Sequence, residues 1–126
     1  MRKTTQSKVT VAHQRIALLR RTGAALRDVA RLPVPKVLTS LPQAALESYS
    51  ASYSRWLKDA SRRCIRLAND WERALTKESQ EMEMSFSLQY LQLQEALQKE
   101  SREYLMISNI MKTKHDTVKN SISNIR

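Results

Sequence analysis

The sequence predicts an all-α protein with long helices in a coiled-coil or helical-bundle assembly and a basic amphipathic segment at its N-terminus. From Gln43 to Arg126, 84 consecutive residues contain neither glycine nor proline, the two residues that most often interrupt helices. The whole chain has one glycine, which argues against strands joined by tight turns. As a single helix, this stretch would be ~126 Å long at ~1.5 Å per residue. It must therefore fold back on itself or lie along partner helices.

The N-terminal part predicts a basic amphipathic helix over residues 8–32. Its apolar residues recur at helical spacing, and arginines occupy the other directions: Val9, Ala12, Ile16, Leu19, Leu26 and Val29 against Arg15, Arg20, Arg21, Arg27 and Arg31. Gly23 is expected to end a first segment as a C-terminal cap. Leu32-Pro33-Val34-Pro35-Lys36 cannot be helical. Two domains are expected: residues 1–36, a basic head with its proline linker, and residues 37–126, a helical rod.

The rod is expected to begin at a capping box and to continue as a long apolar stripe. Ser40 is a suitable N-cap, and Gln43 its partner at the third position. Weak helix formers from Ser48 to Ser54 make a bend or loop there plausible. From Tyr53 onward, apolar residues recur about every 3.6 residues, the period of a straight helix. Residues 76–81 are all polar, so a turn that folds the rod back is expected there, with weaker breaks at Ser108-Asn109 and Lys119-Asn120; a continuous helix stays open.

Residues 82–90 alternate apolar and polar side chains, which alone is typical of a strand. Good helix formers surround them, and no partner strand is evident, so a helix is favoured. On a helix, Met84, Leu88 and Leu91 form a stripe roughly opposite that of Met82, Phe86, Tyr90 and Leu93, so other helices must cover the segment on two sides. The candidate partner interface comprises Trp56, Trp71, Met82, Met84, Phe86, Leu88, Tyr90, Leu93 and Leu97.

The sequence carries none of the common catalytic motifs. It contains no phosphate-binding glycine loop, no Cys-x-x-Cys, no His-Glu-x-x-His and no nucleophile elbow. His13 and His115 lack ligand-type neighbours and are expected at the surface. The single Cys64 is expected to be a buried, inert thiol. We therefore expect no enzyme activity, no cofactor and no metal site.

Positive charge is concentrated in the first third of the chain. The net charge is +10; residues 1–42 contribute +8, residues 43–80 +2 and residues 81–126 zero. This asymmetry indicates an anionic partner. The candidate anion-binding residues are Arg15, Arg20, Arg21, Arg27, Arg31, Arg62, Arg63 and Arg66. For the last three, ion pairs with Asp59 and Asp70 at helical spacing are the alternative.

These features favour a non-enzymatic helical scaffold or assembly subunit. It would oligomerise or pack with other helical chains, and its basic head would contact an anionic surface such as DNA or RNA; a membrane surface is less favoured. The alternative is an accessory or assembly subunit of a mitochondrial complex, because residues 2–27 are acid-free and arginine-rich, as targeting segments are. No apolar run reaches membrane-spanning length and no secretory signal is evident. An intracellular location, nuclear or mitochondrial, is expected.

Overall fold

The computed structural model describes residues 2–32, 42–75, 80–104 and 112–125. Within these ranges the chain forms α1 (Arg2–Arg31), α2 (Gln43–Leu75), α3 (Gln80–Arg102) and α5 (Lys112–Ser123), with no strand. The all-α prediction is confirmed, and the strand alternative for residues 82–90 is wrong. Good helix formers and burial of one face outweigh the local alternation of polarity.

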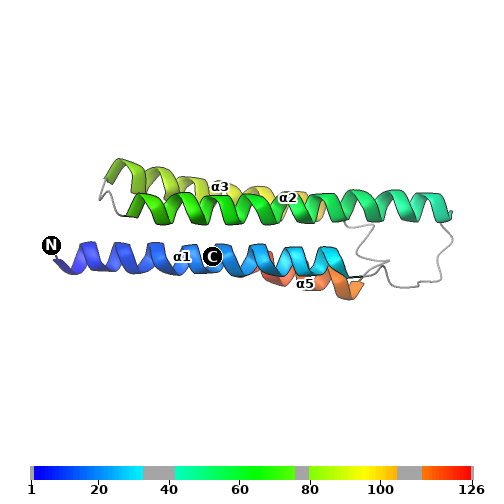
Figure 1. The fold of residues 1–126 in the computed structure, drawn as a ribbon, viewed down its shortest axis with the longest axis horizontal. Helices are drawn as coiled ribbons and strands as arrows, with labels where there is room; N and C mark the ends of the chain where they lie inside the picture. The colour runs from blue at the N-terminus through cyan, green and yellow to red at the C-terminus, as the bar shows by residue number, and fades with distance from the viewer. Residues whose placement is uncertain (1, 33–41, 76–79, 105–111, 126) are drawn as a thin grey trace.

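The helices lie side by side along one long axis, and consecutive helices run in opposite directions (Figure 1). α1 packs along α2, α2 along α3, and α5 against both α1 and α3. The expected return of the rod is therefore present: α2 ends at Leu75, α3 begins at Gln80, and residues 76–79 lie outside the described residues. The short α5 runs beside only the C-terminal half of α1 (Figure 1).

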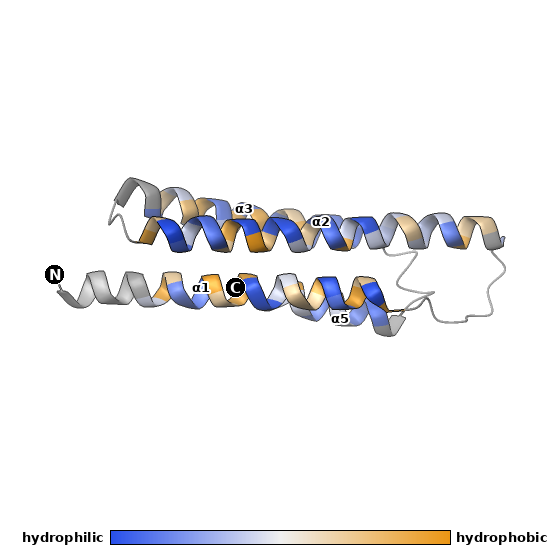
Figure 2. Cartoon of the chain, in the orientation of Figure 1, coloured by the Kyte–Doolittle hydropathy of each residue, from blue (hydrophilic) through white to orange (hydrophobic). Residues whose placement is uncertain are grey.

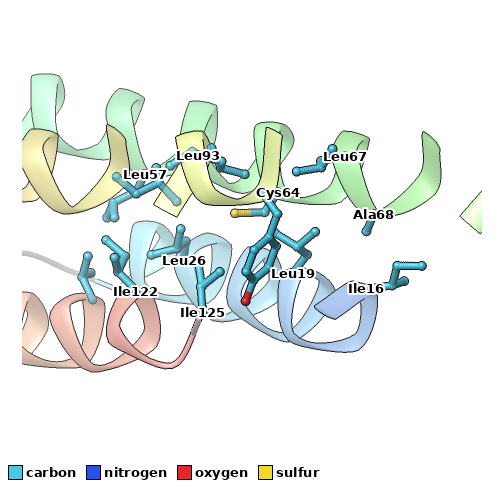
Figure 3. Close-up of a cluster of buried hydrophobic side chains, with 14 of the residues drawn as sticks. Ile16, Leu19, Leu26, Leu57, Cys64, Leu67, Ala68, Leu93, Ile122 and Ile125 are labelled. Carbon is cyan, nitrogen blue, oxygen red and sulfur yellow. The ribbon is translucent and has the colours of Figure 1, made fainter. Parts of the chain in front are cut away.

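One core lies between the four helices of the described ranges. Leu26 from α1, Leu57 from α2, Leu93 from α3 and Ile122 from α5 point toward one another (Figure 3). The buried apolar residues that form this core are Ala12, Ile16, Leu19, Leu26, Val29, Tyr53, Leu57, Ala60, Cys64, Leu67, Ala68, Trp71, Tyr90, Leu93, Leu97, Val118, Ile122 and Ile125. Each helix carries both polar and apolar residues along its coloured part (Figure 2), as the two faces of an amphipathic helix require. The expected head thus shares its core with the rod; the expected boundary at residue 36 lies outside the described residues.

Gly23 does not end a segment as expected, because α1 continues unbroken to Arg31. Instead, Gly23 lies where α1 and α2 approach each other closely. A Cβ at Gly23 would lie 2.8 Å from Cγ1 of Ile65 and 3.2 Å from the carbonyl oxygen of Ser61. The Ser61 hydroxyl donates a hydrogen bond of 2.6 Å to the carbonyl oxygen of Gly23. The missing side chain therefore lets α1 and α2 meet here, and this contact fixes their register.

Two other expected interruptions are also absent. The serine-rich stretch from Ser48 to Ser54 continues as helix, since α2 runs from Gln43 to Leu75 and Tyr53 within it is fully buried. Lys119 and Asn120 lie inside α5, between the buried Val118 and Ile122. Tertiary burial here outweighs weak helix propensity. Ser108-Asn109 and the Ser40 cap lie outside the described residues.

The N-terminal part of α5 is anchored to the C-terminal end of α1. Lys114 is buried, and its Nζ donates a hydrogen bond of 3.1 Å to the carbonyl oxygen of Leu32. A cation is favourable at this end of a helix, where the last carbonyls carry partial negative charge. Burial nevertheless lowers the pKa of Lys114. This contact helps to hold the shortest described helix in place.

Candidate anion-binding surface

Arginines from two helices gather around one shallow, open cleft between α1 and α2. Arg27 of α1 and Arg62, Arg66 and Arg73 of α2 line it, together with Ile65, Asn69 and Asp70. Its volume is about 280 Å³. Four guanidinium groups therefore face one carboxylate. We refer to these four arginines as the arginine cleft.

Helical spacing places these side chains on one side of the molecule. Arg62, Arg66 and Arg73 follow one another at four and seven residues, so they share one face of α2. On α1, Arg20 and Arg27 are seven residues apart and likewise share a face. The close contact between Gly23 and Ser61 holds the two faces next to each other.

Carboxylates at the edge of the cleft neutralise part of the charge. Arg20 pairs with Glu72 and contacts Oδ1 of Asn69 at 3.4 Å, and Arg73 pairs with Asp70. Both pairs are solvent-exposed. Exposed pairs contribute only ~0–1 kcal/mol each, so an incoming polyanion can exchange partners with them at little cost.

Arg62 and Arg63 both approach Asp59, at 4.0 and 3.7 Å. The first of these distances is at the limit for an ion pair, and the Arg62 side chain is 69% exposed. Arg62 therefore remains accessible from solvent. The expected intrahelical pairing is present in part, with Asp59 as its centre.

Arg15 and Arg63 are used inside the fold. The guanidinium of Arg15 lies 4.8 Å from the centre of the Tyr90 ring, a cation–π contact. Arg63 donates to both carboxylate oxygens of Glu100, the shortest contact being 2.8 Å. Arg21 and Arg31 are exposed but do not line the cleft. Of the candidate residues, the cleft brings together Arg27, Arg62 and Arg66.

Arg73 and Asn69 also line the cleft, although neither was among the residues predicted from the sequence. Arg73 lies seven residues beyond Arg66, so the same helical face could have identified it. Asn69 carries no charge, so no feature of the sequence marked it as a candidate anion-binding residue. Both residues lie beside α1 only because α1 and α2 pack together, and local sequence patterns do not predict which helices pair.

The candidate partner-interface residues differ in how far the chain itself covers them. Four are buried in the chain's own core: Trp71, Tyr90, Leu93 and Leu97. Trp56 and Phe86 are partly buried against it. Met84 and Leu88 are exposed, and the side chain of Met82 lies outside the description.

His115 is buried, so its expected surface position is wrong. Its Nδ1 shares a hydrogen bond of 2.7 Å with the Tyr53 hydroxyl, and its ring lies in an aromatic cluster with Tyr53, Trp56 and Tyr104. Nε2 has no partner within the described part of the chain. Position 115 coincides with the apolar stripe, which was the signal for burial. His13, in contrast, is exposed as expected.

The structure predicts that acidification below the usual pKa of histidine, ~6.5, weakens the fold through His115. Burial, and then the charge of Lys119, lower the pKa of His115, while Asp116 opposes them. A lowered histidine pKa means that the fold favours the neutral ring. The contribution of His115 to the stability of the fold is therefore fully present above pH ~6.5. It is lost as the pH falls through the pKa that His115 has in the folded state.

Denaturant unfolding at several pH values between about 7 and 5 measures this effect. His115→Gln should remove the pH dependence in this window, and His13→Gln should retain it. Carboxylates titrate mainly below this range. An unchanged slope in His115→Gln would assign the acid sensitivity to another group.

Glu100 joins α3 to α2 through two donors. Its carboxylate accepts hydrogen bonds of 2.8 Å from Trp56 Nε1 and from Arg63. Burial alone would raise the pKa of Glu100, but these hydrogen bonds and the charge of Arg63 lower it overall. Arg63 therefore has a partner on another helix, whereas the more exposed Arg62 approaches Asp59 of its own helix at 4.0 Å.

The thiol of Cys64 is buried, as predicted. Burial raises its pKa to about 12, although the charge of Arg63 opposes this, so the reactive thiolate is not populated at neutral pH. Within the described ranges, no three potential metal ligands cluster. None of the helices described here has the length and hydropathy needed to cross a membrane.

Comparison with known proteins gave no match to a family model, a curated protein or a solved structure.

Proposed function

We propose that the protein is a non-enzymatic helical scaffold or assembly subunit, packed as a helical bundle with other helical chains, whose arginine cleft contacts nucleic acid. The observation that carries this proposal is the convergence of Arg27, Arg62, Arg66 and Arg73 around one open cleft. The planar guanidinium group is well suited to phosphate oxygens, which it can bind in pairs.

The layout of the cleft suits a linear polyanion better than a single small anion. From Arg62 to Arg73 the helix rises ~16 Å at ~1.5 Å per residue, and Arg66 lies between them. Duplex DNA presents a phosphate at every ~3.4 Å of its axis on each strand. A row of guanidinium groups of this length can therefore follow several phosphates.

A membrane surface is less well supported. A helix that lies on a bilayer exposes an apolar face beside its basic face. In α1 that face is covered, since Ala12, Ile16, Leu19 and Leu26 are buried in the core. The same burial supports a role for α1 in the folded protein beyond that of a removable targeting segment.

Titration of a labelled DNA duplex at several salt concentrations tests the proposal. We expect the logarithm of the affinity to fall linearly with the logarithm of the salt concentration, at about −0.9 per phosphate neutralised. Four arginines in contact would give a slope of about −3 to −4. Different duplex sequences should bind about equally, because phosphate contacts carry no base information. No measurable binding at low salt would overturn the proposal and favour the mitochondrial alternative.

A further inference from the structure

α3 carries an apolar stripe that the chain itself does not cover. Met84, Leu88 and Leu91 are 73%, 56% and 48% exposed. They lie four and three residues apart, so they follow one side of the helix. We refer to these three residues as the α3 stripe. Together they form a local exposed apolar surface, the kind of feature that marks a contact site.

The stripe begins where α5 ends. Gln98 and Ser101 of α3 face Lys119 and Ile122 of α5 across a shallow pocket. Leu91 and Met84 lie seven and fourteen residues before Gln98, hence on nearly the same side of α3. α5 does not reach that far along the helices (Figure 1).

The neighbouring flank of α1 is uncovered in the same way. Thr22 of α1 contacts the carbonyl oxygen of Ser121 in α5 at 3.4 Å. Val11, eleven residues earlier, lies on nearly the same side of α1 and is 41% exposed. One end of the molecule therefore has three packed helices, and the fourth position, which α5 occupies at the other end, is open toward Val11 and the α3 stripe.

Charge indicates what can occupy that position. α3 has four acidic and two basic residues, whereas α1 has eight basic and one acidic. Residues 84–94 carry no charge at all. Because the chain has a net charge of +10, copies repel each other across most of their surface. The uncharged stretch of α3 is where a second copy can approach, and Glu83 and Glu95, which flank this stretch, are attracted to the basic α1 of that copy.

We propose that a second copy of this chain covers the α3 stripe. In the resulting two-fold dimer, α3 of each copy fills the open position of the other and lies against both α3 and α1. A two-fold axis brings the same surface of each copy together, so Leu88 lies near Leu88 of the other copy. A stable interface buries ~800 Å² per partner. Three side chains are too few for that area, so the proposed contact has to include the exposed Val11 of α1 as well.

This inference rests on the proposed assembly with helical chains and identifies the partner. Light scattering of the full chain across a dilution series tests it. Wild type should have the mass of a dimer. Leu88→Glu with Leu91→Glu should raise the dissociation constant at least ~100-fold, since each tenfold step is ~1.4 kcal/mol. Its helix content and melting temperature as a monomer should stay unchanged, because both side chains are exposed.

Tyr49→Glu is the matched control. Tyr49 is also exposed and apolar, but it lies toward the start of α2, at the opposite end of the molecule (Figure 1). Its variant should remain dimeric. A monomeric wild type would overturn the inference, and so would an unchanged dimer in the Leu88/Leu91 variant or equal dissociation of the Tyr49 variant.

Oxidative cross-linking tests the two-fold geometry separately. Leu88→Cys should give a disulfide-linked dimer, and Tyr49→Cys should not. Cys64 is buried and does not compete. Absence of cross-linked Leu88→Cys dimers would contradict the proposed axis. Duplex binding is measured on the same samples: a monomer that binds duplex refutes the dimer alone, and a dimer that does not bind refutes the arginine cleft alone.

Discussion

Trp71→Ala should lower the free energy of unfolding by ~3–5 kcal/mol, the usual cost of removing a large buried aromatic side chain. Trp71 is only 2% exposed. Its ring stacks on Phe86 with centroids 6.0 Å apart and meets the edge of Tyr90 at 6.1 Å. Substitution by alanine would leave a cavity between α2 and α3. Chemical denaturation followed by circular dichroism measures the change.

Phe86→Ala is the comparison for Trp71→Ala. The two apolar stripes of residues 82–93 predict that Phe86 is covered in the assembled state, whereas the single chain leaves it only partly buried. Its substitution should therefore cost less than that of Trp71 under conditions in which the chain is monomeric. Equal costs would contradict this ranking and would show that Phe86 contributes as much to this part of the core as Trp71.

Reversing two arginines of the cleft should nearly abolish duplex binding. Arg62→Glu with Arg66→Glu replaces two attractive contacts with two repulsive ones, in a row that we expect to follow the phosphates. We expect a loss of at least ~100-fold in affinity at low salt, or ~2.7 kcal/mol. Fluorescence anisotropy with a labelled duplex measures it.

Lys99→Glu with Arg102→Glu provides the matched control, because it changes the net charge equally. Lys99 and Arg102 are exposed on α3, away from the cleft. This variant should lose less than ~10-fold, through the general field of the protein. Equal losses in the two variants would mean that net charge, and not the cleft, determines binding.

Periodicity predicted most of the helical structure, because burial of one face sets the spacing of apolar residues. The same periodicity places His115 on the apolar stripe, which indicates burial, although its residue type suggests the surface. Local cues failed where tertiary contacts compete with them. Considered alone, Gly23 predicts a helix end. In the structure it lies within α1, where its missing side chain lets α1 approach Ser61 of α2.

The sequence predicted individual residues of the candidate sites, but it did not predict which of them meet in space. Spacing places Arg62 and Arg66 on one face of α2, but their meeting with Arg27 depends on how α1 and α2 pair. Similarly, an apolar stripe predicts that a helix face is covered. It does not show whether the chain's own core or a partner chain covers that face. Trp71 is covered by the chain itself, and Met84 is left exposed. Such distinctions require the arrangement of the helices in space.

Chemical modification of arginines with phenylglyoxal, with and without bound duplex, tests directly whether the arginine cleft contacts nucleic acid. Mass spectrometry then reports which guanidinium groups the nucleic acid covers. Bound duplex should protect Arg27, Arg62 and Arg66 and leave Arg102 reactive. Protection of Arg102 to the same degree, or unchanged reactivity of Arg62 and Arg66, would contradict it.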